Sequence, residues 1–289
     1  MMIYMLAIMN ERFQIPIGEM PAEFLASNIP TIAQFCVSIL HNSALAGSGT
    51  LVQCGDKHGI VTAHHVVYKG NRPFDFRYGS DDAIGLLIMD TPHEFVLPLK
   101  YIVCHDIGVP VSDEEGPDLV FLEIPPGEKL GALRARKSFF NITAKKAERL
   151  SFLEDDGKGF WAISYSVDFQ STTVKMENGF PAIVVHTWVG YTGIDSRYDA
   201  DEFDYIEAGV SYTSENDLPP TFGGASGGGL WKFPLSGAKR NDDKLDIEAG
   251  NPVYAGVLFY ETHREENYRR IRCHGPKSLY QTMANKLLG

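Results

Sequence analysis

The sequence predicts an all-β fold, and three observations point to it. Short runs rich in Val, Ile, Phe and Tyr recur along the chain, each about the length of a β-strand. Clusters of Gly, Pro, Asn and Asp separate these runs, as turns do. Helical patterns are confined to three short segments. Ten or more strands in this arrangement are typical of a sandwich or barrel rather than of alternating strand–helix units.

The expected strands share this apolar or alternating pattern, and in chain order they are Phe35–Leu40, Gly49–Cys54, Gly59–Ala63, Ile84–Met89, Glu94–Val103, Leu119–Ile124, Gly159–Ser166, Ala182–Val189, Tyr205–Tyr212 and Tyr254–Tyr260. The three expected helices are Pro21–Ser27, Thr143–Leu150 and an amphipathic C-terminal segment, Ser278–Leu288.

A charged stretch between Pro125 and Gly159 interrupts the strand pattern and divides the chain into two β units of similar size. We expect an N-terminal extension (1–30), a first β unit (31–130), a linker (131–155), a second β unit (156–275) and a C-terminal helix (276–289). The two units show no convincing sequence repeat.

Composition and charge argue against several classes of protein. With 289 residues, 44% hydrophobic and 22% charged, the chain has ordinary globular values. A net charge of −11 without a basic stripe argues against nucleic-acid binding. No stretch reaches the length of a membrane span. Four scattered cysteines, and an apolar N-terminus that lacks a basic flank, favour a cytoplasmic, non-secreted protein.

The most informative segment is residues 223–230, Gly-Gly-Ala-Ser-Gly-Gly-Gly-Leu, in which Ser226 lies among five glycines. Glycine loses more backbone entropy on folding than other residues, so such a run indicates positive φ angles or a close approach to a ligand. A serine at its centre is typical of a nucleophile on a tight turn, where neighbouring N–H groups can hold an oxyanion. A flexible glycine loop is the alternative.

A serine nucleophile needs a base and an acid behind it. The candidate base lies in residues 59–67, where an apolar strand runs through Thr-Ala into His64 and His65. Adjacent side chains do not face one point, so at most one of the two histidines is the base.

The candidate acid is Asp118, which begins a nearly continuous apolar strand directly after Gly-Pro. A buried carboxylate there needs charge-assisted hydrogen bonds, and a histidine N–H supplies one. A turn aspartate is the alternative interpretation. Asp90, Asp106 and Asp113 are weaker candidates because none begins so apolar a strand.

These segments, in the order His, Asp, Ser, resemble signatures of the chymotrypsin/trypsin-like serine peptidase family, especially its bacterial intracellular and HtrA-like branches. Residues 47–52 resemble its glycine-rich strand, 61–66 its Thr-Ala-Ala-His-Cys segment and 118–122 its Asp-Ile-Ala-Leu-Leu strand. Residues 224–230 resemble Gly-Asp-Ser-Gly-Gly-Pro-Leu, and 256–260 match the substrate-binding edge strand. The motifs span most of the chain.

The resemblance implies two six-stranded β-barrels and a serine endopeptidase. Alignment on Thr62-Ala63 makes His65 the base, with Asp118 orienting it and Ser226 as nucleophile. The resemblance further implies an oxyanion hole formed by the N–H groups of Gly224 and Ser226. Peptide substrate is expected to bind along Leu258, Phe259, Tyr260 and Glu261, and no metal or organic cofactor is expected.

Three departures from the family pattern carry information. Ala225 replaces the aspartate that receives a freed N-terminal amine in zymogen-activated members, so activation by cleavage is not expected. Gly229 replaces a proline. The position that sets charge preference falls near residues 219–221, where no acid is present, so tryptic specificity is not expected. Glu261 and Thr262 are candidates for lining the specificity pocket.

Two alternatives differ in class. A catalytically silent peptide-binding module would show loss of a triad member or of the oxyanion glycines, and neither is missing. An esterase of the α/β-hydrolase type needs a strand-to-helix elbow and the order Ser, acid, His. Two acidic stretches, 199–204 and 241–248, are expected to be surface insertions in the second β unit. Because a cytoplasmic peptidase must be restrained, we expect narrow specificity or an activating protein partner that engages these acidic insertions or the N-terminal 30 residues.

Overall fold

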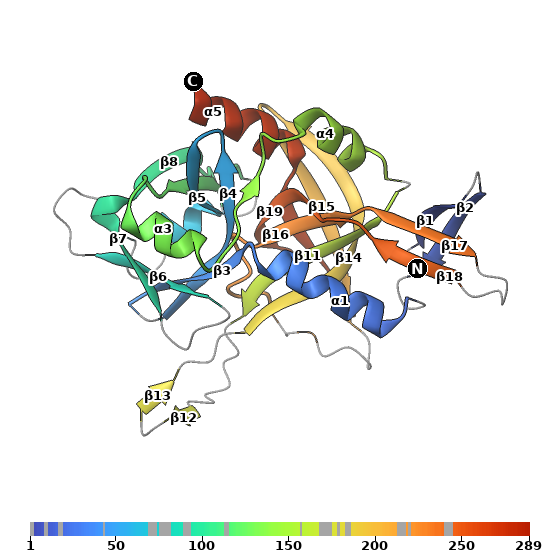
Figure 1. Ribbon diagram of the computed structural model, residues 1–289, viewed down its shortest axis with the longest axis horizontal. Coiled ribbons are helices and arrows are strands. Elements are labelled where there is room, and N and C mark those ends of the chain that lie inside the picture. The colour runs from blue at the N-terminus through green and yellow to red at the C-terminus, as the bar shows by residue number, and fades with distance from the viewer. Residues whose placement is uncertain are drawn as a thin grey trace.

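The computed structural model describes residues 3–8, 11–16, 20–42, 44–68, 74, 82–88, 94–112, 116–156, 158–167, 175–177, 180–182, 186–212, 218, 221–239 and 245–289. Most of these residues lie in two β units that pack side by side, an open sheet and a closed barrel (Figure 1).

The first unit is a curled sheet with strand order β7-β6-β3-β4-β5-β9-β8, in which neighbours pair antiparallel. Its strands are β3 (Cys36–His41), β4 (Ala44–Cys54), β5 (Lys57–Thr62), β6 (Ala83–Leu87), β7 (Phe95–Pro98), β8 (Val103–Gly108) and β9 (Leu119–Glu123), and β10 (Phe140–Asn141) adds parallel to β4.

The sequence predicts a closed six-stranded barrel for this unit; the structure shows a half-barrel sheet, and closure is not confirmed. Within the described residues no ladder joins the edge strands β7 and β8. The short 3-10 turn η2 (Leu99–Tyr101) connects them, so the sheet must curl until its two edges approach. A cavity of about 510 Å³ is lined by parts of β7, η2, β8 and the segment after β9.

The second unit is a closed barrel with strand order β11-β14-β15-β20-β19-β16. Its strands are β11 (Phe160–Val167), β14 (His186–Ala200), β15 (Phe203–Ser211), β16 (Gly229–Phe233), β19 (Val253–Glu261) and β20 (Tyr268–His274). Every pairing is antiparallel. The prediction of a six-stranded barrel is therefore confirmed for this half. A two-stranded ribbon, β12 (Lys175–Glu177) with β13 (Phe180–Ala182), is separate from it.

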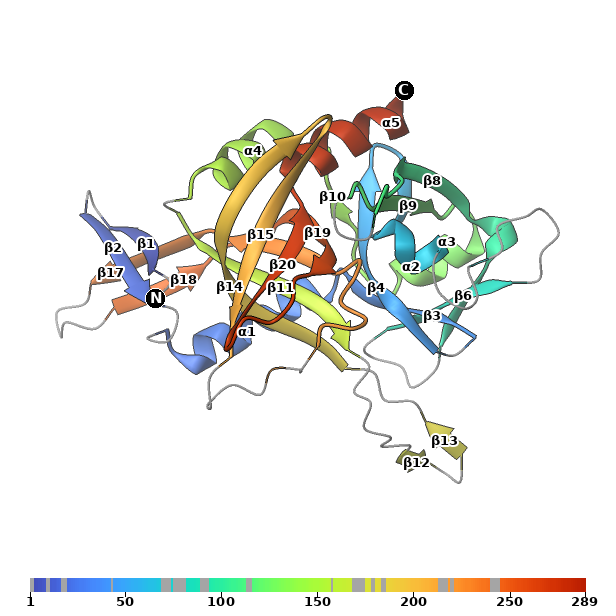
Figure 2. The same cartoon turned by 180° about the vertical axis from the view of Figure 1, so that it is seen from behind.

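A third sheet, which the sequence did not indicate, has the order β18-β17-β1-β2. It joins the N-terminal strands β1 (Ile3–Ile8) and β2 (Glu11–Pro16) to β17 (Leu235–Lys239) and β18 (Leu245–Ala249) of the second unit. This sheet lies at the end of the barrel that is farther from the open sheet (Figures 1 and 2). Strand β18 falls in the expected acidic loop 241–248, of which residues 241–244 lie outside the described residues.

The helices are short; three regions match the expected segments in position, whereas α2 and α3 were not expected. They are α1 (Ala22–Ala33), α2 (His64–Tyr68), α3 (Glu128–Arg134), α4 (Lys146–Glu154), the π-helical segment η3 (Ser278–Met283) and α5 (Ala284–Leu288). The C-terminal helix α5 extends from the barrel over the open sheet (Figure 1), where Lys286 Nζ binds the carbonyl of Ile107 in β8. In the described part of the chain the longest helix has 12 residues, too short to cross a bilayer.

The core where the two β units meet is aromatic. Trp231 of β16 is fully buried and stacks on Phe35, with ring centroids 5.5 Å apart. Its ring also meets Phe140 of β10 edge-on and Tyr254 of β19. The indole N–H donates to Ser164 Oγ at 2.9 Å, so the polar atom of this buried ring is satisfied. These contacts connect the open sheet, the linker and the barrel.

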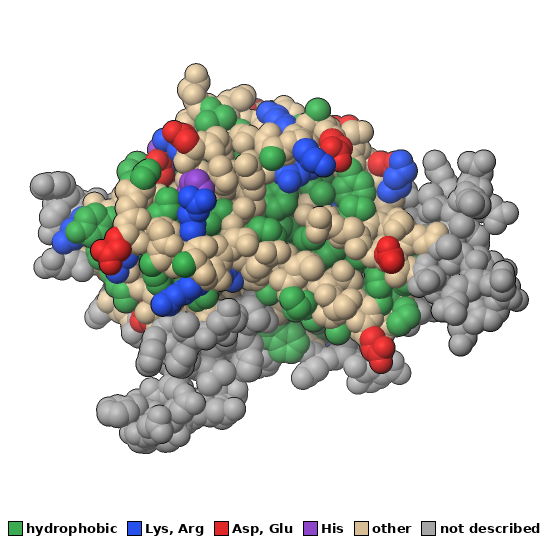
Figure 3. Space-filling view, viewed as in Figure 1, with side chains coloured by type: hydrophobic (Ala, Val, Ile, Leu, Met, Phe, Trp, Pro, Cys, Tyr) green, Lys and Arg blue, Asp and Glu red, His purple; other side chains and the backbone are tan. Residues whose placement is uncertain are grey.

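The face of the molecule shown in Figure 3 is mixed rather than divided by charge. On the face shown in Figure 3, acidic and basic side chains are interspersed among apolar and neutral groups. All four cysteines are unpaired, and three of them (Cys36, Cys54 and Cys273) are buried.

Trp231→Ala tests the aromatic contact between the units. Removing this buried ring should lower the free energy of unfolding by about 3–5 kcal/mol, because transfer and cavity costs add. Urea unfolding measures the change. Tyr101→Ala is the control, since that ring is 54% exposed and its loss should cost less than about 0.5 kcal/mol. Equal effects of the two substitutions would contradict the assignment of Trp231 to the joint core.

Candidate active site

His65 lies on the first turn of α2, directly after the central strand β5. Strand β5 pairs with β9 in the register Thr62↔Val120, which places the start of α2 beside the residue that precedes β9, Asp118. Two segments more than 50 residues apart in the chain are thus brought together by one strand pairing.

Asp118 binds His65 twice. The carboxylate Oδ2 lies 2.5 Å from His65 Nδ1, and Oδ1 accepts the backbone N–H of His65 at 2.9 Å. Asp118 is 1% exposed. Burial alone would raise the pKa of this carboxyl, but the hydrogen bonds and charge of His65, with a smaller effect of His274, hold the pKa below its usual value. A charged Asp118 fixes the proton on Nδ1 and leaves the Nε2 lone pair free to act as a base.

The neighbouring histidine faces another way. His64 Nε2 lies 3.7 Å from Asp106 Oδ1, and its ring stacks on Tyr68 with centroids 4.3 Å apart. Asp106 therefore pairs with His64 and not with His65. The other acid candidates, Asp90 and Asp113, lie outside the described residues.

Ser226 lies in a loop of two consecutive turns that leads into β16. The N–H of Ala225 donates to Phe222 O, and that of Gly228 donates to Ala225 O, both at 2.8 Å. Gly224 and Gly227 have φ angles of +87° and +85°, in the left-handed region that favours glycine. The loop turns sharply on both sides of the serine, which explains the density of glycines around it.

The loop is attached to the other β unit through Ser48 of β4. The N–H of Ser48 donates to Ser226 O at 2.8 Å, and its hydroxyl donates to Gly224 O at 2.7 Å. The same hydroxyl accepts the N–H of Ser166 in β11 at 2.7 Å. The backbones approach so closely that a Cβ at Gly227 would lie 2.0 Å from Ser48 O. Gly227 is thus required by both its φ angle and its surroundings.

Some backbone N–H groups of the loop are hydrogen-bonded within the protein and others are not. Gly227 donates to Leu258 O at 2.7 Å, and Ala225 is bonded within the turn. The N–H groups of Gly224 and Ser226, in contrast, make no hydrogen bond to any other described residue. Two backbone donors that are not used elsewhere, one on the predicted nucleophile itself and one two residues before it, are what an oxyanion hole requires.

A cavity of about 230 Å³ opens beside Ser226. Its lining includes both His65 and Ser226, so the structure brings the predicted base and nucleophile to one cavity. The four residues predicted to bind substrate also line it, and the full set is His65, Phe222, Gly223, Ala225, Ser226, Leu258, Phe259, Tyr260, Glu261 and Ile271. Among the described residues, no hydrogen bond joins Ser226 to His65. Such bonds often tighten only when substrate binds.

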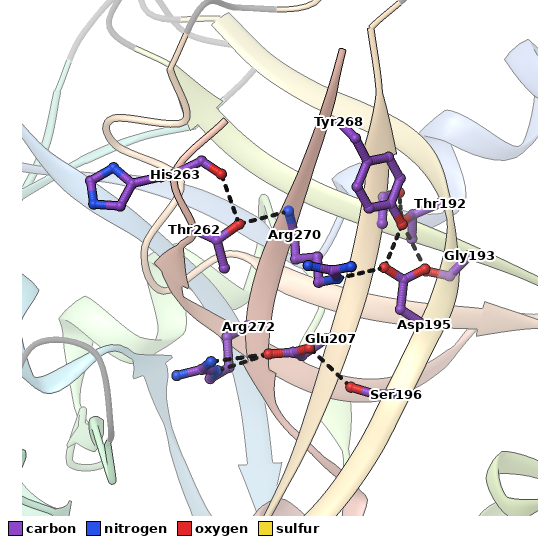
Figure 4. A network of polar contacts seen from close by, with 11 residues as sticks. Thr192, Gly193, Asp195, Ser196, Glu207, Thr262, His263, Tyr268, Arg270 and Arg272 are labelled. Carbon is purple, nitrogen blue, oxygen red and sulfur yellow. Dashed lines mark hydrogen bonds and ion pairs between the residues drawn. The ribbon is translucent and has the colours of Figure 1, made fainter. Parts of the chain in front are cut away.

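Thr262, also considered for the pocket, is not part of that lining. Its hydroxyl accepts the backbone N–H of Arg270 at 3.0 Å, as Figure 4 shows. Of the segment near residues 219–221, where the family's charge-selecting position falls, Pro219 and Pro220 lie outside the described residues.

Sequence reasoning missed His274, at the end of β20. Its Nε2 accepts the backbone N–H of Asp118 at 2.9 Å, and its ring packs against Phe259 with centroids 4.7 Å apart. Burial lowers the pKa of His274 to about 4, although the charge of Asp118 opposes this shift. The neutral ring of His274 therefore fixes the backbone of Asp118 through this hydrogen bond. The sequence signal that could have pointed to His274 is its position at the end of an arginine-rich strand.

Comparison with known proteins assigns no family to this chain. No model of a known protein family matches the sequence. No curated protein matches it either. In the described part of the chain, no three or more His, Cys, Asp or Glu side chains are grouped so that they could hold a metal ion.

The low pKa of His274 predicts a pH dependence of stability. Its unfolded pKa is about 6.5, so between pH 6.5 and 4 the unfolded chain binds a proton there that the folded chain does not. Stability therefore rises with pH across this window, and His274 alone should contribute a loss of about 2 kcal/mol between pH 7 and pH 5. Urea unfolding at the two pH values measures this loss.

His274→Asn is the matched variant, because asparagine can still accept the Asp118 N–H but does not titrate. The loss of stability between pH 7 and pH 5 should be smaller in the variant than in the wild type. The same loss in both proteins would show that His274 is not held neutral.

Proposed function

We propose that this chain is a serine endopeptidase related in fold to the chymotrypsin-like peptidases. The observation that carries the proposal is that His65, which is hydrogen-bonded to Asp118, and the loop serine Ser226 line one cavity, and that the N–H groups of Ser226 and nearby Gly224 make no hydrogen bond to another described residue. In this proposal the open sheet and the closed barrel correspond to the two barrels of that fold.

The proposed mechanism follows from these positions. His65 Nε2 takes the proton of Ser226 Oγ as the oxygen attacks the scissile carbonyl, and an acyl-enzyme forms. The N–H groups of Gly224 and Ser226 stabilise the oxyanion, an effect worth ~10²–10³ in rate for a single donor. Protonated His65 then donates to the leaving amine, and Asp118 stabilises the imidazolium throughout. Water releases the acyl group by the same steps in reverse order.

An extended peptide is the substrate that fits the strand beside the cavity. Strand β16 pairs with β19 only as far as Val257, and the next residue of β19, Leu258, bonds Gly227 and Gly228 in the loop that precedes β16. Beyond Leu258 that side of β19 is not covered by β16, so substrate backbone can add along Phe259 to Glu261 as a further strand.

A catalytically silent peptide-binding module is the alternative, and the absence of a hydrogen bond between Ser226 and His65 in the described residues favours it. The esterase alternative has less support, because Ser226 leads into the strand β16 rather than into a helix. The activating partner and the cytoplasmic location stay predictions.

Cleavage of a proteome-derived peptide library tests the proposal. The wild type should cleave a defined subset, and Ser226→Ala should abolish cleavage. Asp118→Asn should lower kcat by ~10⁴, because the histidine is then held in the wrong tautomer.

Ser151→Ala is the control, since this serine is exposed on α4 and its loss should leave the cleavage pattern unchanged. A wild type that cleaves nothing, or cleavage that survives in Ser226→Ala, would contradict the proposal.

A further inference from the structure

The cavity beside Ser226 is walled mainly by apolar side chains. Phe222 and Ala225 come from the loop around Ser226, Leu258 and Phe259 from β19, and Ile271 from β20. At about 230 Å³ the cavity exceeds the ~150 Å³ that suffices to hold benzene in an apolar protein site. An aromatic or branched aliphatic side chain therefore fits.

Glu261 is the one carboxylate among the described residues that line this cavity. A free carboxylate here would attract a lysine or arginine side chain of a substrate. Its Oε2, however, accepts the N–H of Phe222 at 2.8 Å and is also bonded to Arg269 Nη1. The charge of Glu261 is thus already paired before any substrate enters.

Arg269 lies on the opposite face of β20 from Arg270 and Arg272. Arg270 pairs with Asp195 and Arg272 with Glu207, in the network of Figure 4. Since side chains alternate along a strand, Arg269 shares the opposite side with Ile271, which lines the cavity. The side chain of Arg269 is only 10% exposed, whereas those of Arg270 and Arg272 are 38% and 20% exposed.

A cationic substrate side chain would meet an unfavourable environment in this cavity. It would lose its hydration water among the apolar walls. The one carboxylate among the described lining residues, Glu261, is already paired with Arg269, and the positive charge of Arg269 would repel a second cation. An uncharged apolar side chain has neither cost.

We propose that the cavity binds an uncharged apolar side chain of the substrate, and that Arg269 sets this preference by neutralising Glu261. The inference rests on the proposed peptidase function and names the substrate class of that site. Arg269 is here a specificity-determining residue that acts through Glu261.

Matched peptides that differ only in the residue on the acyl side of the scissile bond, Leu, Phe or Lys, test the proposal. The wild type should cleave the Leu and Phe peptides with higher kcat/KM than the Lys peptide. Arg269→Gln frees the carboxylate and should raise the Lys-to-Leu ratio of kcat/KM at least about tenfold. The double variant Arg269→Gln/Glu261→Gln should lose this gain.

Arg269→Lys keeps the positive charge and should keep the apolar preference of the wild type. A wild type that prefers Lys, an unchanged ratio in an active Arg269→Gln variant, or a gain that persists in the double variant would each overturn the proposal.

A second measurement needs no variant and covers the case in which Arg269→Gln does not fold. Peptidyl phosphonates with a leucine or a lysine side chain next to the phosphorus should inactivate the wild type at different rates, the leucine compound faster. Faster inactivation by the lysine compound overturns the inference alone. Failure of both compounds to react overturns the proposed peptidase function, and the inference with it.

Discussion

The candidate site depends on the contact between Ser48 and the loop around Ser226 (residues 222–228). His65 and Asp118 belong to the open sheet, whereas Ser226 belongs to the barrel, so neither β unit holds a complete site. Ser48 binds the carbonyls of Gly224 and Ser226 and also the N–H of Ser166. Because three short hydrogen bonds meet at one buried residue, a shift of either unit would leave polar groups unpaired, which costs about 1–3 kcal/mol for each group.

Electrostatics at the site are arranged around one buried charge. The carboxylate of Asp118 is almost fully buried and is stable there because His65 supplies two donors. His274 accepts the backbone N–H of Asp118 without carrying a charge, since burial keeps its ring neutral. At the cavity the part-buried carboxylate of Glu261 is likewise paired, with the largely buried Arg269.

Local patterns selected candidate residues that the structure brings together: His65 is hydrogen-bonded to Asp118, and His65 and Ser226 line one cavity. The strand that leads into His65, the apolar strand after Asp118 and the glycine loop around Ser226 are each readable over fewer than ten residues. Contacts between distant segments were not readable in this way. The unpaired edges of β7 and β8 depend on how far the first sheet curls. The pairing of β1 with β17 depends on which strand edges stay unpaired once the barrel has formed. Ser48 and His274 likewise act through partners far away in the sequence, and Arg269 acts through Glu261 across a strand pairing.

The central claim is that Ser226 is a nucleophile activated by His65. The most direct measurement is reaction of the folded chain with a fluorophosphonate, in which Ser226 Oγ bonds to phosphorus and fluoride leaves, followed by mass-spectrometric mapping of the adduct. The account predicts a single adduct on Ser226 in the wild type and its loss in His65→Gln. An unmodified Ser226, or an adduct that forms equally well without His65, would contradict it.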